Sequence, residues 1–271
     1  MELYDAIFYR KSIRKYVIRN IKDELMTEVK NICKNINYPN KDINIKAHVV
    51  EKGHLINILM QKKNNIKAPH YIVVTSNEVE DYSFNVGFAI EEVVLKLTSL
   101  GIGTCWLETN LDIDSMREFI EIDEIEFLED EEIDENELDL KKEKVQIIIA
   151  FGYPEESENI FRKDKSKIDR KSLKDICKKI DSQWTDIIEA VRLSPSIDNS
   201  QPWIMYKDGG SIHIYSKKKK KNIDELSKMS MGIAIRHFDI ACKRFSKNIE
   251  YSTKCPKKRL NKDFYVSAIL K

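Results

Sequence analysis

One succession of patterns occurs twice along the chain, and this repetition constrains the fold more than any other feature. A strand pattern at 70–75, an apolar helix at 87–100 and a strand at 145–150 have counterparts at 212–215, 232–241 and 264–270. The helical pattern at 184–191 also resembles residues 4–7. A divergent repeat of this length predicts two stacked halves that share a core. We expect the halves to be 1–170 and 171–271, packed as one compact unit.

Composition excludes several classes of protein. The chain has 271 residues, 42% hydrophobic, with a net charge of +1, so it can bury a core but carries no global field for nucleic acid or membranes. No stretch approaches the roughly 20 apolar residues of a membrane span, and the N-terminus lacks a secretory pattern. The five cysteines lack CxxC spacing, which favours reduced thiols over disulfides or zinc. These features predict a cytoplasmic protein that binds neither nucleic acid nor membranes.

Periodicity predicts a mixture of helices and strands. Further helices are expected at 3–9, 21–35, 56–60, 111–120 and 172–180, and further strands at 44–50, 101–107 and 203–206. The helix at 87–100 is apolar nearly all round, which places it at the centre of a domain, and Gly101 follows where a helix C-cap is expected. The fold class predicted from periodicity alone is therefore mixed α and β.

The stretch 194–203 follows neither a helical nor a strand period. It reads Ser-Pro-Ser-Ile-Asp-Asn-Ser-Gln-Pro-Trp, in which two prolines end one element and open the next. Ser196, Asn199 and Gln201 could present polar atoms to a flat heteroaromatic ligand. The same composition is also that of an ordinary turn after a helix.

A second unusual stretch follows the first predicted helix. Arg10, Ser12 and Arg14 alternate in an extended segment, so their side chains share one face. Two guanidiniums and a hydroxyl suit a phosphate and an electron-rich ring edge. The alternative is a solvated, basic start of a strand.

Together these two stretches resemble the nitroreductase family of FMN enzymes. The family carries an Arg-x-Ser-x-Arg element and a Ser-Pro-Ser-x-x-Asn-x-Gln-Pro-Trp element, and both are matched here residue for residue. Gly101–Leu107 and Phe151–Pro154 add to the resemblance. The second element comes near the end of this chain rather than a few dozen residues after the first, as in a branch of the family with two fused halves.

The resemblance implies an α+β nitroreductase-like fold, with a mixed, mainly antiparallel sheet and core helices. The family usually forms homodimers with flavin at the interface, which implies an internal pseudo-dimer with one complete flavin site here. The second pseudo-site would be empty. The chain itself would be a monomer or a homodimer.

The resemblance also implies roles for particular residues. The expected FMN-binding residues are Arg10, Lys11, Ser12, Arg14, Trp106, Leu107, Arg170, Pro195, Ser196, Ile197, Asn199 and Gln201. Arg10 and Ser12 would hold the phosphate and ribityl chain, Arg14 the N1/O2 ring edge, and Ser196 and Asn199 its polar edge. The implied function is hydride transfer from NADH or NADPH through FMN to a small acceptor such as a nitroaromatic or a quinone. Because the flavin carries the chemistry, no catalytic side chain is expected.

Three stretches permit other interpretations. Cys105 and Trp106 could be ordinary core residues, with core favoured for Cys105. The acidic stretch 121–143 reads as a solvated excursion, without a calcium-loop pattern. The five lysines at 217–221 lack interleaved aromatics and are more typical of a hairpin tip than of a nucleic-acid site. The alternative function is a non-catalytic, flavin-binding or degenerate structural member of the family.

Overall fold

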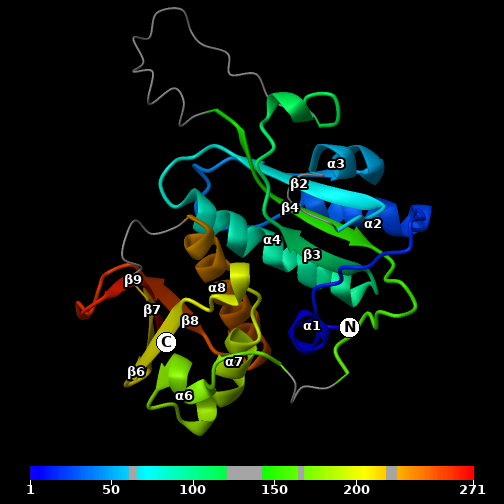
Figure 1. Cartoon of the computed structure of the whole chain (residues 1–271). Coiled ribbons are helices and arrows are strands. Elements are labelled where there is room, and N and C mark those ends of the chain that lie inside the picture. The colour runs from blue at the N-terminus through cyan, green and yellow to red at the C-terminus, as the bar shows by residue number, and fades with distance from the viewer. Residues whose placement is uncertain (61–65, 121–141, 164–167, 218–224) are drawn as a thin grey trace, which may run out of the picture.

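A computed structural model describes residues 1–60, 66–120, 142–163, 168–217 and 225–271 (Figure 1). The N-terminal half contains helices α1 (Leu3–Tyr9), α2 (Asp23–Lys34), α3 (Gly53–Met60) and α4 (Tyr82–Ser99), the 3-10 helix η1 (Asp114–Met116), and strands β1 (Ile45–Val50), β2 (His70–Ser76), β3 (Gly103–Leu107) and β4 (Lys144–Gly152). The C-terminal half contains helices α6 (Leu173–Ile176), α7 (Ser182–Arg192) and α8 (Glu225–Arg244), the 3-10 helix η2 (Ile197–Asn199), and strands β5 (Cys177–Lys178), β6 (Trp203–Asp208), β7 (Ser211–Lys217), β8 (Ile249–Ser252) and β9 (Lys262–Leu270).

Each half builds one antiparallel sheet with the same strand order. The first sheet runs β1-β2-β4-β3, and the second runs β6-β7-β9-β8 with β5 added in parallel beside β6. The register shifts at Val74 between β2 and β4, and at Ile214 between β7 and β9. Because the order and the irregularity both recur, the two halves have the same topology, as the sequence repeat predicts.

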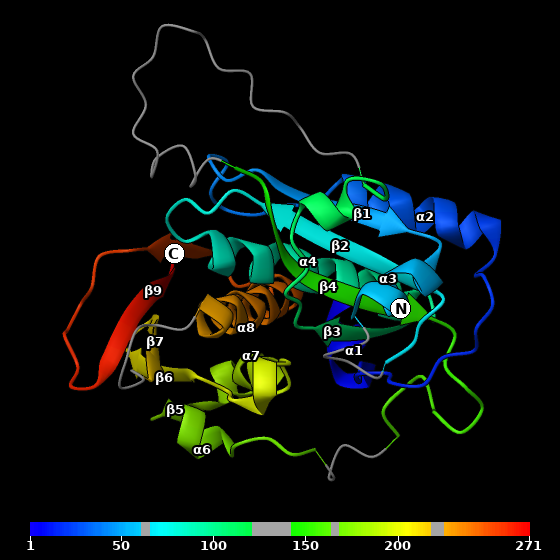
Figure 2. The same cartoon turned by 45° about the horizontal axis from the view of Figure 1, so that its top comes forward.

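Helices α4 and α8 lie side by side between the strands of the two halves (Figure 2). A Cβ at Gly87 in α4 would lie 2.0 Å from the carbonyl oxygen of Met229, and a Cβ at Gly232 in α8 would lie 2.0 Å from that of Phe84. Each glycine thus meets the residue three positions before the other glycine. This reciprocal contact relates the two halves by an approximate two-fold and lets their backbones approach closely.

Some predicted elements differ from those of the structure. The helix expected at 111–120 is reduced to η1, and the one at 172–180 ends at Ile176 because Cys177 becomes extended and pairs with Met205 of β6. The counterpart of α7 is α2 and not residues 4–7. A ten-residue loop, 35–44, joins α2 to β1, and a loop of the same length, 193–202, joins α7 to β6. Most of the acidic stretch and Lys218–Lys221 lie outside the described residues.

Glu143 makes a polar cluster with β1 and β2 that ties down the start of β4. Its carboxylate accepts a hydrogen bond from the Thr75 hydroxyl, lies 3.1 Å from Nζ of Lys46 and 3.5 Å from Nε2 of His48. Burial alone would raise the pKa of Glu143, but hydrogen bonds from His48, Thr75 and Lys46 outweigh burial and lower the pKa from 4.5 to about 2. The folded chain therefore favours the ionised carboxylate.

The stability that Glu143 contributes should be present above pH 4.5 and be lost as the pH falls toward 2. We expect Glu143→Gln to reduce the acid-dependent loss of unfolding free energy by about 1–2 kcal/mol after solvent screening. Urea unfolding at a series of pH values measures this loss, with the exposed Glu24→Gln as control. Identical acid dependence in wild type and Glu143→Gln would contradict the assignment.

No helix among the described residues combines the length and the apolar character needed to cross a lipid bilayer.

Candidate functional site

A cavity of about 700 Å³ lies where the segment after α1, strand β3 and the loop after α7 meet. This volume is in the usual range for small-molecule sites. The structure brings ten of the twelve predicted site residues to its wall: Arg10, Lys11, Ser12, Arg14, Trp106, Arg170, Pro195, Ser196, Ile197 and Asn199. Leu107 and Gln201 are not among the lining residues, and both are buried.

The segment after α1 lies along the edge of the first sheet. Ser12 forms a parallel bridge with Thr104 of β3, and the Ile13 N–H donates to the Thr104 carbonyl at 2.9 Å. Ile13 faces the core against Gly103, where a Cβ would lie 2.7 Å from the Ile13 side chain. Arg10, Ser12 and Arg14 are all on the cavity side, as predicted from alternation.

Strand β3 supplies one wall of the cavity. Cys105 is buried and also lines the cavity, so both interpretations of this residue apply to it. Burial raises the pKa of its thiol, although the charges of Arg14 and Arg10 oppose that rise. Trp106 lines the cavity and donates its indole N–H to Glu91, whereas Leu107 packs in the core around Ile13.

The loop after α7 has a strained backbone that is held by local hydrogen bonds. Asp198, Asn199 and Gln201 have φ of 52°, 51° and 45°, the left-handed region that costs about 1–3 kcal/mol for a non-glycine residue. The Ser196 hydroxyl accepts a hydrogen bond from the Gln201 N–H at 2.9 Å, and the Ile197 N–H donates to Ser230 Oγ at 3.2 Å. Strain of this kind persists where the surroundings over-determine the loop, which is common at binding sites.

Gln201 connects this loop to the residues before α6. Its side-chain amide donates to the Asn199 side-chain carbonyl at 3.2 Å and accepts from the Lys171 N–H at 2.7 Å. Arg170 Nη1 donates to the same Asn199 oxygen at 2.6 Å, and the Asn199 amide donates to Asp169. Gln201 therefore supports Asn199 from behind the cavity wall rather than lining it.

Three guanidiniums, those of Arg10, Arg162 and Arg170, gather at one end of the cavity. Arg10 is 3% exposed, and its Nη1 is buried without a hydrogen-bond partner among the described residues, as is Nε of Arg170. Burial, and then the charge of Arg10, lowers the pKa of both Arg162 and Arg170 to about 10, and Arg192 adds to this repulsion. These guanidiniums make this end of the cavity suited to an anion.

Sequence reasoning missed several lining residues. Arg162 falls in a polar stretch without a period, and its backbone N–H is held by the Tyr9 carbonyl at 2.8 Å. Glu158 comes from the same stretch and pairs with Lys11 at 2.9 Å, which neutralises that lysine. Ile233 enters from α8. Only a run of basic residues after Pro154 could have indicated Arg162. No cluster of metal-binding side chains occurs in the described part of the chain.

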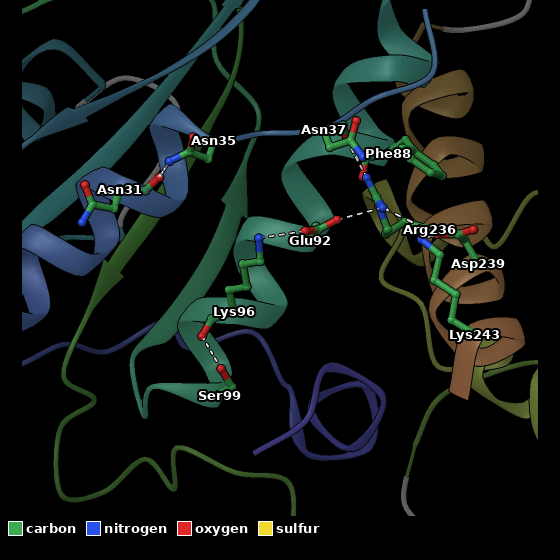
Figure 3. Close-up of polar contacts among 10 residues, drawn as sticks. All are labelled: Asn31, Asn35, Asn37, Phe88, Glu92, Lys96, Ser99, Arg236, Asp239 and Lys243. Atoms are coloured by element: carbon green, nitrogen blue, oxygen red, sulfur yellow. Dashed lines mark hydrogen bonds and ion pairs between the residues drawn. The ribbon is translucent and has the colours of Figure 1, made fainter. Parts of the chain in front are cut away.

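Arg236 makes polar contacts with the other half (Figure 3), at the place that the approximate two-fold relates to the cavity. The glycine pair relates Phe88 of α4 to the cavity-lining Ile233 of α8, and the guanidinium of Arg236 lies 3.7 Å from the centre of the Phe88 ring. Arg236 also donates to the carbonyl of Asn37, in the loop that corresponds to 193–202, and pairs with Glu92 at 2.8 Å. The two related places are therefore built differently.

Known structures resemble this chain in their fold. A putative nitroreductase structure from Thermotoga maritima is 21% identical, with 100% of this chain and 94% of that chain covered and a TM-score of 0.63. Two other matches are partial: a nitroreductase family protein from Clostridium novyi (21% identity, 59% and 90% covered, TM-score 0.42) and an FMN-dependent nitroreductase from Clostridium difficile (19%, 62% and 98%, 0.41). No curated protein matches the sequence.

The likeness to the Thermotoga structure concerns the fold, because the identity is low. The family model described as "Putative TM nitroreductase" matches residues 2–123 and 131–242, which together make up most of the chain. The matched ranges include both the Arg10–Arg14 segment and the Ser194–Trp203 loop. The chain therefore belongs to this nitroreductase family, with the nitroreductase-like α+β fold that the sequence predicted.

Proposed function

We propose that the chain is an oxidoreductase that binds FMN in the cavity and transfers electrons from NADH or NADPH to a small acceptor. The observation that carries the proposal is Arg10 Nη1, which is buried beside two other guanidiniums and has no hydrogen-bond partner in the described part of the chain. A buried cationic donor without a partner costs free energy, and an anion bound beside it would remove that cost. FMN fits this requirement, because it joins a phosphate to a flat heteroaromatic ring.

The phosphate belongs at the Arg10 end of the cavity. Arg10, Arg162 and Arg170 would bind it with charge-assisted hydrogen bonds, and Ser12 would donate to the ribityl chain. Lys11 contributes less charge, because Glu158 already pairs with it.

The ring belongs between β3 and the Ser196–Asn199 loop. When bound, FMN would supply hydride transfer at N5 between a nicotinamide and the acceptor. Arg14 would stabilise negative charge at the ring edge, and Trp106 and Ile197 would enclose the ring. The strained loop would present Ser196 and Asn199 to the polar edge, with Gln201 and Pro195 keeping the loop rigid.

The absorption spectrum of the purified protein between about 300 and 550 nm tests this proposal. We expect bound or added FMN near one per chain, because Arg236 fills the counterpart of the cavity. Anaerobic NADH or NADPH should bleach the flavin, and a nitroaromatic or a quinone should restore it. Chromatography of the released cofactor identifies it.

Each other result has a definite meaning. A chain that takes up no FMN overturns the proposal. A chain that binds FMN but is not reduced by either nicotinamide is a non-catalytic flavin-binding member of the family. Two FMN per chain would show that the Arg236 side also binds flavin.

A further inference from the structure

A buried hydrogen-bonded chain links the cavity wall to the two central helices. Trp106 Nε1 lies 3.1 Å from Glu91 Oε2 in α4, and Glu91 Oε1 lies 2.8 Å from His237 Nε2 in α8. His237 Nδ1 lies 2.9 Å from the carbonyl oxygen of Ala190 in α7. Glu91 and His237 are both 0% exposed, so neither carboxylate nor imidazole has water as an alternative partner.

The donor and acceptor at each end of this hydrogen-bonded chain are determined. The indole can only donate and the Ala190 carbonyl can only accept, so Nδ1 of His237 carries a proton. One Glu91 oxygen accepts from Trp106, and the other shares a single proton with Nε2 of His237. Each polar group between Trp106 and Ala190 in this series of hydrogen bonds is thereby satisfied. Removing the Glu91 carboxylate would leave the Trp106 indole without an acceptor.

The approximate two-fold relates the Glu91–His237 pair to a second pair, Arg236 and Glu92, which does not reach the cavity. The glycine pair relates Glu91 to Arg236 and Glu92 to His237, so the Glu91–His237 contact corresponds to the Arg236–Glu92 contact. Both contacts join α4 to α8. The Arg236 contact is completed by the Phe88 ring and the Asn37 carbonyl (Figure 3), whereas the Glu91 contact extends to an indole at the cavity wall.

We propose that Glu91, held by His237, is a positioning residue that fixes the Trp106 indole against the bound cofactor. The inference rests on the proposed function, because it concerns the same cavity. The same chain reaches the opposite wall, since Ala190 lies in the last turn of α7, just before the Ser194–Trp203 loop. Glu91 thus connects both walls of the cavity, through hydrogen bonds, to helices α4 and α8. This role does not require Glu91 to contact FMN.

The first test is the affinity of the full-length, FMN-free chain for added FMN. We expect Glu91→Leu to weaken binding about tenfold and to alter the visible circular dichroism of bound FMN, because the freed indole no longer holds one orientation. Glu91→Gln should restore most of both, since its amide can accept from Trp106 and donate to neutral His237. Equal losses in Glu91→Leu and Glu91→Gln would contradict the role.

A double-mutant cycle separates positioning from general destabilisation. If Glu91 acts through Trp106, Glu91→Leu should change FMN affinity less than about threefold in a Trp106→Phe background. A tenfold loss in both backgrounds overturns the proposal. The matched control is Glu92→Leu, which breaks the related helix link away from the cavity and should lower stability without changing FMN affinity or KM and kcat.

A measurement on the wild-type chain does not depend on the folding of any Glu91 variant. The Trp106 indole N–H, assigned with Trp106→Phe, should exchange slowly with solvent in 15N NMR spectra and shift when FMN is added. Rapid exchange would overturn the proposal. A wild-type chain that binds no FMN overturns the proposed function instead, and slow exchange would then show only that the buried link exists.

Discussion

Gly232→Ala is expected to destabilise the chain by about 3 kcal/mol, the upper end of the usual cost of overpacking. Inside a helix this change normally stabilises by about 0.5–1 kcal/mol. Here the new Cβ would lie 2.0 Å from the carbonyl oxygen of Phe84 and 2.8 Å from the Phe88 nitrogen. These are backbone atoms of α4, so no side-chain rotation relieves the clash and the two helices must separate.

Urea unfolding followed by circular dichroism measures the effect. Gly87→Ala should cost about as much, because its Cβ meets Met229 in the reciprocal contact. Gly210→Ala is the control, because the nearest atom to its Cβ is 3.6 Å away. If Gly232→Ala were as stable as wild type, the close approach of α4 and α8 could not be the contact that joins the halves.

Local periodicity predicted many of the helices and strands, whereas the nitroreductase-like fold was predicted from the family resemblance. The apolar helix around Gly87 and its counterpart around Gly232 are the central pair, and Gly101 ends α4 with φ of 77°. The predicted match of residues 184–191 with residues 4–7 was wrong. The pattern of apolar residues in a short helix is similar in several helices of the chain, so this pattern alone does not identify the counterpart. Sheet order was needed to align α7 with α2, and sheet order depends on long-range pairing.

The candidate site was predictable where a motif is contiguous and not where tertiary packing assembles it. Arg10, Ser12 and Arg14 could be placed on one face from alternation alone. Arg162 could not, because its position depends on the path of a stretch without regular structure. In the sequence, Glu91 and His237 are isolated polar residues in two apolar helices. Their hydrogen bond becomes evident only when α4 is packed against α8.

Replacing Arg10 should weaken FMN binding without weakening the fold. Arg10→Met keeps an unbranched side chain at the buried position and removes one of the three cations there. Loss of charge-assisted hydrogen bonds worth about 1.5–3 kcal/mol predicts FMN affinity about 10- to 150-fold lower. The FMN-free chain should be as stable as wild type or more stable, by about 1 kcal/mol, because repulsion with Arg162 and Arg170 is relieved.

The opposite signs of these two effects distinguish a binding residue from a structural one. A structural arginine has its partners within the fold, so its loss would destabilise the FMN-free chain, whereas the Nη1 of Arg10 has none among the described residues. Fluorescence titration with FMN and urea unfolding with and without FMN measure the two effects. Arg19→Met is the matched control, since it makes the same charge change at a side chain that lies over the Tyr153 ring and does not line the cavity. An Arg10→Met chain that is destabilised but binds FMN like wild type would mean that the phosphate lies elsewhere.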